Sequence, residues 1–265
     1  MGRLAYIGYP YQSWGNGYYQ RWVSRHELGH NFTLWHAGNL TCPGQSIGPN
    51  CVGAYSSNEY GDPFDTMGNI YPGHFNAVQK SALNWLPAGS VKTHTSGTAT
   101  STLSPLESPG QSTYAVKIQA ASNRTYWIEY RQPIGFDAGI ASSNAAQIRV
   151  SGRYPDIFEF PCTNCGGDDT EILDMTLNTP GNFSDASLLQ GQTYVDSTYN
   201  VTIHVISATP SALTLSVSMP GASAAPTAAG AVSRKMHGAA GVFDLPLSMV
   251  ATNPTTEPRQ GPRRP

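Results

Sequence analysis

The stretch from His26 to His36 constrains this chain more than any other part of its sequence. On an α-helix, residues four apart lie about 40° apart around the axis and about 6 Å apart along it. His26 and His30 can therefore present ring nitrogens to one metal ion. Glu27 then lies beside that ion, where its carboxylate can hydrogen-bond a water instead of binding the metal. This spacing predicts a helix over residues 17–31 that carries a zinc site.

His36 determines how the chain must continue after that helix. If the helix ran on, His36 would lie about 9 Å beyond His30 along the axis and could not bind the same ion. A break between Asn31 and Trp35 would bring His36 back toward the other two imidazoles. The expected result is a site with three histidine ligands and with positions open for water and substrate. Zn²⁺ is the expected metal, and three imidazoles also suit copper or another first-row metal.

Several motifs together resemble one family of peptidases. The run His26-Glu-Leu-Gly-His-Asn-Phe32, followed by Leu34 and His36-Ala37, resembles the extended zinc signature of metzincin metallopeptidases, in the form of the gametolysin family of volvocine green algae. Further runs are similar to the Met-turn, the closing helix and the following β domain of such proteins: Tyr60-Gly-Asp62 with Asp65-Thr-Met-Gly68, His74-Phe-Asn76 with Leu83-Asn-Trp85, and Tyr126–Arg131 with Leu188–Thr193.

This resemblance implies a zinc-dependent endopeptidase. Its metal ligands would be His26, His30 and His36, its general base would be Glu27, and Met67 would form an apolar floor under the site. Its substrates would be proteins or glycoproteins of an extracellular matrix or cell wall. The alternative is a catalytically inactive matrix or binding protein that retains the metal motif on an incomplete catalytic domain.

The sequence departs from the family pattern in two places. Thr33 stands where metzincins have a glycine, which makes the turn after the helix because glycine tolerates a positive φ. A β-branched residue there is strained by about 1 to 3 kcal/mol. Either another residue, such as Asn31, makes the turn, or His36 is held less well. Family catalytic domains also begin well upstream, so residues 1–88 correspond to an N-terminally incomplete one.

The remaining chain predicts few helices and many strands. A short strand is expected over residues 4–9, and a second helix over residues 76–85, ended by Pro87. Beyond residue 90, short β-prone runs between turn residues predict an antiparallel β-sandwich. The clearest predicted strands are Tyr114–Ile118, Thr125–Tyr130, Gln147–Val150, Val201–Ile206 and Leu213–Val217.

The expected fold class is therefore α+β, in three parts. Residues 1–88 are expected to form the C-terminal part of a metzincin-like peptidase domain, and residues 89–219 the β-sandwich. Residues 220–265 are rich in Pro, Ala and Gly and cannot bury enough apolar surface to offset their ordering entropy, so we expect a disordered tail.

Composition excludes several classes of partner and favours an extracellular location. Only 12% of the residues are charged and the net charge is -2, which provides no basic surface for nucleic acid or for an anionic membrane. No run of about 18 apolar residues predicts a membrane span. The first ten residues do not form a signal peptide. The best candidates for N-glycosylation in a secreted protein are Asn39, Asn123, Asn182 and Asn200.

The four cysteines are expected to form two local disulfides. Cys42 and Cys51 lie between the third histidine and the Met-turn, where a bond would restrain the floor of the site. Cys162 and Cys165 have the C-x-x-C spacing of redox or zinc sites. However, no second pair has matching spacing and no thioredoxin-like pattern surrounds them, which favours a disulfide in a loop of the β domain.

Overall fold

The structure, a computed structural model, describes residues 18–48, 50–51, 58–69, 73–140, 145–151 and 170–221, with side chains from Trp22 onward. All of them belong to the first of the two units into which the chain divides, Met1–Ser223 and Ala224–Pro265. The expected strand over residues 4–9, the pair Cys162 and Cys165, and the tail from residue 222 lie outside the described residues.

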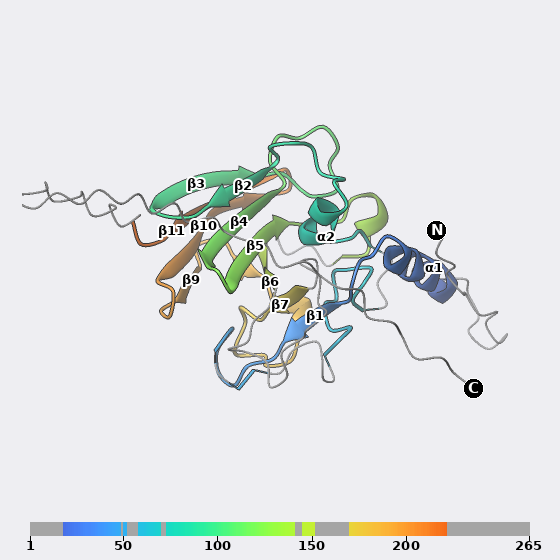
Figure 1. Ribbon diagram of the computed structural model, residues 1–265, viewed down its shortest axis with the longest axis horizontal. Helices are drawn as coiled ribbons and strands as arrows, with labels where there is room; N and C mark the ends of the chain where they lie inside the picture. Colours follow the sequence, from blue (N-terminus) through green and yellow to red (C-terminus); the bar gives the residue numbers. More distant parts are fainter. Residues whose placement is uncertain are drawn as a thin grey trace, which may run out of the picture. The chain divides into compact units, whose positions relative to one another are not determined.

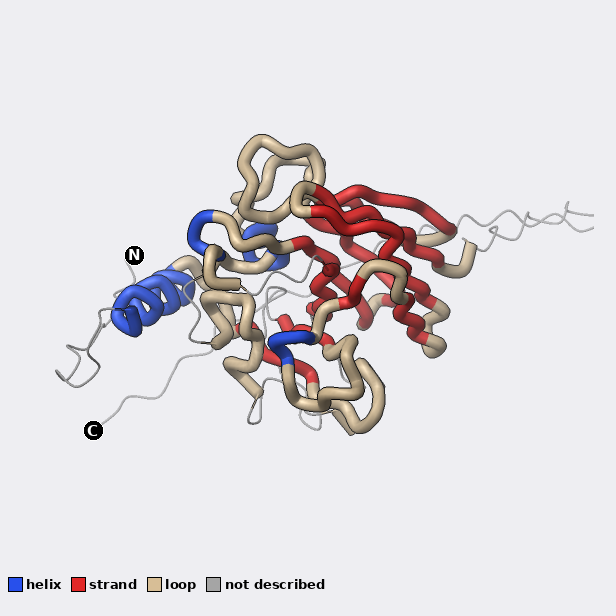
Figure 2. Tube along the Cα trace, turned by 180° about the vertical axis from the view of Figure 1, so that it is seen from behind, coloured by secondary structure: helices blue, strands red, loops and turns tan. Residues whose placement is uncertain are grey.

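The described strands form two sheets, and helices are few (Figures 1 and 2). The larger sheet has the order β1-β7-β6-β5-β4-β2, with β8 paired to β6, and the smaller sheet has the order β3-β11-β10-β9. The strands are β1 (Ala37–Leu40), β2 (Val91–His94), β3 (Thr98–Leu103), β4 (Ala115–Ala121), β5 (Arg124–Tyr130), β6 (Ala145–Ser151), β7 (Thr170–Leu173), β8 (Leu188–Leu189), β9 (Thr193–Asp196), β10 (Val201–Thr209) and β11 (Ala212–Ser218). The helices are α1 (Tyr18–Asn31), α2 (Ala77–Ala82) and the 3₁₀ turns η1 (Gly135–Asp137) and η2 (Phe183–Asp185).

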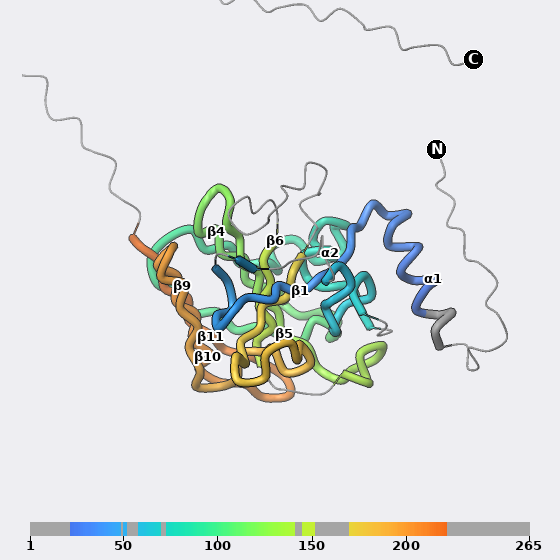
Figure 3. Tube along the Cα trace, turned by 90° about the horizontal axis from the view of Figure 1, so that it is seen from below, coloured from blue at the N-terminus to red at the C-terminus, as the bar shows by residue number. Residues whose placement is uncertain are grey.

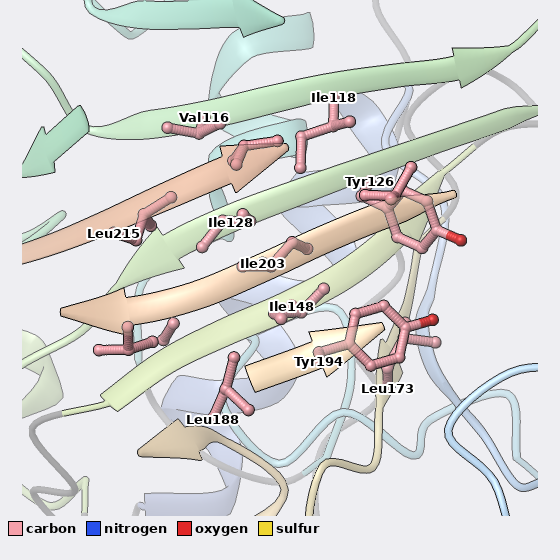
Figure 4. Packing of buried hydrophobic residues seen from close by; sticks show 14 of the residues in the cluster. Val116, Ile118, Tyr126, Ile128, Ile148, Leu173, Leu188, Tyr194, Ile203 and Leu215 are labelled. Atoms are coloured by element: carbon pink, nitrogen blue, oxygen red, sulfur yellow. The ribbon is translucent and has the colours of Figure 1, made fainter. Parts of the chain in front are cut away.

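The main hydrophobic core lies between the two sheets. Strands β10 and β11 alternate buried and less buried residues, as expected for strands with one face on a core. Ile203 and Leu215 of the smaller sheet meet Val116, Ile128 and Ile148 of the larger one in a single buried cluster (Figure 4). The period-two pattern of the sequence therefore places its apolar residues where two sheets can bury them.

The larger sheet is mixed, whereas the sequence predicts an antiparallel arrangement. Its inner strands β4, β5, β6 and β7 pair antiparallel, but β2 pairs parallel with β4, and β1 pairs parallel with β7. The first parallel pair arises because β3, which lies between β2 and β4 in the chain, belongs to the smaller sheet. In the second pair, β1 is the first of the described strands and joins the sheet beside β7, which follows it by about 130 residues.

The predicted elements are present with modest changes at their ends. All five strands named from the sequence form, as β4, β5, β6, β10 and β11, and α1 ends at Asn31 as the histidine spacing requires. Helix α2 is shorter than predicted. The side chain of Asn76 caps its first turn by accepting a hydrogen bond from the Gln79 amide at 3.0 Å, and Asn84 turns the chain away with a φ of 57°.

Strand β1 comes from the part of the sequence expected to form the peptidase domain, and it pairs with β7 from the part expected to form the sandwich. The domain boundary at residue 89 stays a prediction.

Seen from below, β9, β10 and β11 lie on one side of the larger sheet and α1 lies on the other (Figure 3). Within the described residues, neither α-helix is long and apolar enough to cross a lipid bilayer.

Candidate metal centre

The turn that follows α1 reverses the chain at Thr33. Leu34 N–H donates to the Gly29 carbonyl at 3.0 Å, and Thr33 N–H donates to the His30 carbonyl at 2.9 Å. These two bonds form a Schellman motif, in which the residue after the C-cap normally has a positive φ. Thr33 occupies that position with a φ of 75°. The turn therefore uses the residue at the usual glycine position, and the alternative turn at Asn31 is not formed.

The reversal brings the three predicted histidines together. One ring nitrogen of each of His26, His30 and His36 lies within 4.8 Å of the other two, and the Nε2 atoms of His30 and His36 are 3.1 Å apart. A zinc ion bound tetrahedrally at about 2.1 Å requires nitrogens about 3.4 Å apart. Small side-chain rotations are therefore sufficient to bring all three rings onto one ion.

The hydrogen bonds of the opposite ring nitrogens determine the tautomer of each histidine. His26 Nδ1 lies 3.0 Å from the Thr66 carbonyl and His30 Nδ1 lies 3.0 Å from the Leu34 carbonyl. His36 Nδ1 lies 2.5 Å from a carboxylate oxygen of Glu59. Because these oxygens accept, the neutral form of each ring carries its proton on Nδ1, which leaves Nε2 as the nitrogen with a free lone pair.

The spacing and the protonation of the three histidines can be compared with what a metal ion requires of its ligands. Two unprotonated Nε2 atoms at 3.1 Å repel unless a cation or a proton lies between them. Neutral imidazoles whose other nitrogen donates to a carbonyl or a carboxylate are the ligands that zinc sites use. The donor set therefore fits Zn²⁺, and it equally fits another first-row divalent metal.

Burial keeps two of the ligands in the neutral form. Desolvation lowers the pKa of His26, and the neighbouring imidazoles lower it further. The Thr66 carbonyl and the Glu27 carboxylate oppose this decrease. Desolvation also lowers the pKa of His36, although the Glu59 carboxylate opposes this effect. A metal ion consequently competes less with protons at these two rings than at an exposed histidine.

Residues 58–69, which we call the floor loop, support the histidines from below. Thr66 supplies the carbonyl that accepts from both Trp22 Nε1 and His26 Nδ1, each at 3.0 Å. Met67 is fully buried and packs with Leu34 and Ala37. A Cβ added to Gly29 would lie 2.3 Å from the Met67 sulfur, so only glycine allows α1 to approach the loop this closely. Met67 thus packs against α1 and the turn that follows it, and its expected role as an apolar floor under the site stays a prediction.

Three further side chains surround the histidines. Glu27 is half-buried and follows His26 on α1, and its carboxylate contributes to raising the pKa of His26, His36 and Tyr60. The Tyr60 ring lies 4.3 Å from the His36 ring, and burial is the largest cause that raises its pKa, so the phenol keeps its proton. The exposed Trp35 indole lies 6.0 Å from the His36 ring.

Sequence reasoning missed Glu59, which orients His36. A ligating histidine commonly donates its second ring N–H to a carboxylate, and this partner contributes to metal affinity. Glu59 directly precedes the Tyr60-Gly-Asp62 run, so an acidic residue beside the expected Met-turn was the available signal. It could not be distinguished from a solvated surface glutamate until the fold placed it against His36.

The remaining predicted residues are not part of the metal centre. Cys42 and Cys51 form a disulfide in the loop after β1. The Asn39 amide donates to the Gly61 carbonyl at 3.1 Å and holds β1 to the floor loop. The other candidate glycosylation sites lie in turns or beside a 3₁₀ turn, and their modification stays a prediction: Asn123, Asn182 and Asn200.

Comparison of the chain with family models, with curated proteins and with solved structures finds no match. The resemblance to gametolysin-type metzincins therefore rests on the motifs themselves.

Proposed function

We propose that this protein is a zinc-dependent endopeptidase of the gametolysin type. The observation that carries the proposal is that one ring nitrogen of each of His26, His30 and His36 lies within 4.8 Å of the other two, while each Nδ1 has an oxygen acceptor. Glu27 directly follows His26 on the same helix. Motif spacing alone supports a metal site. The orientation of all three rings toward one point adds support for a site that holds the ion tightly and leaves Glu27 free of it.

The residues have complementary roles in peptide hydrolysis. His26, His30 and His36 would hold the zinc ion, which would supply a water of lowered pKa and a positive charge for the peptide carbonyl oxygen. Glu27 takes the proton of the attacking water and delivers it to the leaving amine, as a general base and then a general acid. The protonated phenol of Tyr60 is a hydrogen-bond donor beside the same ligands, suited to the oxygen on which negative charge develops.

The substrate class is proposed from the resemblance together with the composition. Proteins or glycoproteins of an extracellular matrix or cell wall are the expected substrates, and the chain is expected to act outside the cell. The Cys42–Cys51 disulfide supports an oxidising compartment. The exposed Trp35 beside the ligands favours substrates with an apolar side chain near the scissile bond.

Metal analysis and a cleavage assay on the purified chain test this proposal. We expect one zinc per chain and cleavage of a fluorogenic peptide library. Glu27→Gln should keep the metal and lose cleavage by about 10² to 10⁴-fold, the usual contribution of a general base. His30→Ala should lose the metal, whereas His204→Ala, a matched control on β10 outside the site, should keep both metal and cleavage.

Three outcomes would contradict the proposal in different ways. A chain that binds no metal is not a metallopeptidase. A Glu27→Gln variant that cleaves as fast as the parent chain excludes the assigned mechanism. A chain that binds zinc but cleaves no peptide supports the alternative, a matrix or binding protein that retains the metal motif without catalysis.

A further inference from the structure

A buried ion pair connects the floor loop to the centre of the larger sheet. Arg149 of β6 is 1% exposed, and Asp62 of the floor loop is fully buried. The Nε of Arg149 donates to one Asp62 carboxylate oxygen at 2.6 Å and its Nη2 donates to the other at 3.3 Å. Because a guanidinium stays charged and its two donors have a fixed spacing, this contact sets both the position and the orientation of Asp62.

The sheet holds Arg149 in place from its other side. Its Nη1 forms an ion pair with Glu129 of β5 at 2.8 Å, and its Nη2 donates to Gln147 at 3.1 Å. The second oxygen of Glu129 accepts from the Ala77 amide at the start of α2, at 2.6 Å. Glu129 and Gln147 therefore hold the guanidinium from two strands, and the start of α2 holds Glu129 in turn, so Arg149 does not simply follow the loop.

From Asp62, backbone hydrogen bonds lead directly to the metal ligands. Asp62 N–H donates to the Ala37 carbonyl at 3.1 Å, and Ala37 N–H donates to the Met67 carbonyl at 3.0 Å. Ala37 follows the third ligand, His36, in the chain. The carbonyl that fixes the tautomer of His26 belongs to Thr66, four residues after Asp62. A displacement of Asp62 consequently moves the supports of two of the three ligands.

We propose that Arg149 is a positioning residue for the metal centre, which acts through Asp62 to hold the floor loop against α1. Arg149 contacts neither the ligands nor a substrate, and its role is to keep the Thr66 carbonyl and the His36 segment where three lone pairs converge. This inference rests on the proposed function only in assigning a metal to the histidines.

Arg124 offers a matched control. It lies on β5 and is 4% exposed, and it pairs with the buried Asp196 at 3.4 Å. Its Nη1 also donates to the Tyr126 hydroxyl on the same strand at 3.2 Å, and its guanidinium lies over the Tyr199 ring. None of these three residues belongs to the floor loop. Arg124→Met removes the guanidinium that pairs with Asp196, and Arg149→Met removes the one that pairs with Asp62 and Glu129. Because Glu129 keeps Arg131 as a partner at 3.1 Å, each variant leaves one buried carboxylate without a guanidinium, and both lose general stability.

The experiment compares Arg149→Met, Arg149→Lys and Arg124→Met with the parent chain. Zinc affinity is measured by competition with a chromophoric chelator, at a temperature where circular dichroism shows each variant folded. Hydrogen exchange of the Trp22 indole N–H, which donates to the Thr66 carbonyl, reports the position of the floor loop without any metal. Arg149→Lys keeps the charge but loses the two-pronged contact, so it tests the inference if Arg149→Met does not fold.

We expect both Arg149 variants to bind zinc at least 10-fold more weakly and to exchange the Trp22 indole proton at least 10-fold faster, and Arg124→Met to stay within two-fold of the parent in both. Unchanged affinity and exchange in a folded Arg149 variant would overturn the inference, and so would an equal effect of Arg124→Met. If the parent chain binds no zinc, the proposed function fails, while the indole exchange still decides whether Arg149 positions the loop.

Discussion

Replacing Thr33 with glycine should stabilise the protein, although the change removes a side chain. Thr33 has a φ of 75° at the turn that delivers His36 to the site. A residue with a Cβ in this left-handed region costs about 1 to 3 kcal/mol. The side chain is exposed, so its removal sacrifices little packing. Glycine adds about 0.4 to 1 kcal/mol of unfolded-state entropy, which leaves a net gain of about 0 to 2.6 kcal/mol, with a middle value of about 1.3 kcal/mol.

Urea and thermal unfolding measure this gain directly. For a unit of this size, we expect the midpoint temperature of Thr33→Gly to rise by about 3 to 5 °C at the middle value of this gain. Thr33→Ala is the necessary comparison, because alanine keeps the Cβ and most of the steric cost. Asn84→Gly, at a φ of 57°, should gain less, since asparagine tolerates this region. A Thr33→Gly variant no more stable than Thr33→Ala would refute the assignment of strain to this turn.

Further predictions concern the supports of the site and the buried charges. Glu59→Gln should weaken zinc binding about 10-fold or more, measured by chelator competition, because His36 loses its charged acceptor. Gly29→Ala should lower stability in urea unfolding despite alanine's higher helix propensity, because its Cβ meets Met67. Burial raises the pKa of Glu107 to about 8, so the native state keeps a proton that the unfolded chain releases above about pH 4.5. Stability should therefore fall as the pH rises from about 4.5 to 8, and Glu107→Gln should flatten this slope in unfolding curves. Removal of zinc by a chelator should lower stability by about 2.7 kcal/mol when the parent is measured at 100 times Kd.

The sequence predicts the parts of the fold that depend on periodicity and turn chemistry. The i, i+4 spacing of His26 and His30 locates α1, and alternation locates strands such as Val201–Thr209, because both patterns follow from backbone geometry within a short window. The parallel pairing of β1 with β7 could not be found in this way, since it joins segments about 130 residues apart and neither strand carries a signal for its partner.

The three candidate ligands could be predicted from the sequence, but the groups that support them could not. Histidine side chains in a fixed spacing leave a signature in the sequence, whereas Thr66 contributes a backbone carbonyl that any residue type provides. The positive φ of Thr33 marks the limit of propensity reasoning. A β-branched residue such as Thr33 disfavours the left-handed conformation that this turn needs. The packing of the following Leu34 against Met67 overrides that preference.

The contacts of two consecutive floor-loop residues, Thr66 and Met67, explain what sets the position of α1. The Thr66 carbonyl accepts from Trp22 and His26, which lie one turn apart on α1, and Met67 packs on Gly29, about one turn further along. A shift of the helix along its axis by one residue would break both hydrogen bonds and drive a side chain into the methionine sulfur. Two adjacent residues thus fix the rotation and the translation of α1 together. The two histidines of α1 are consequently held in place without an ion, so little of the binding energy of the proposed metal would be spent on ordering them.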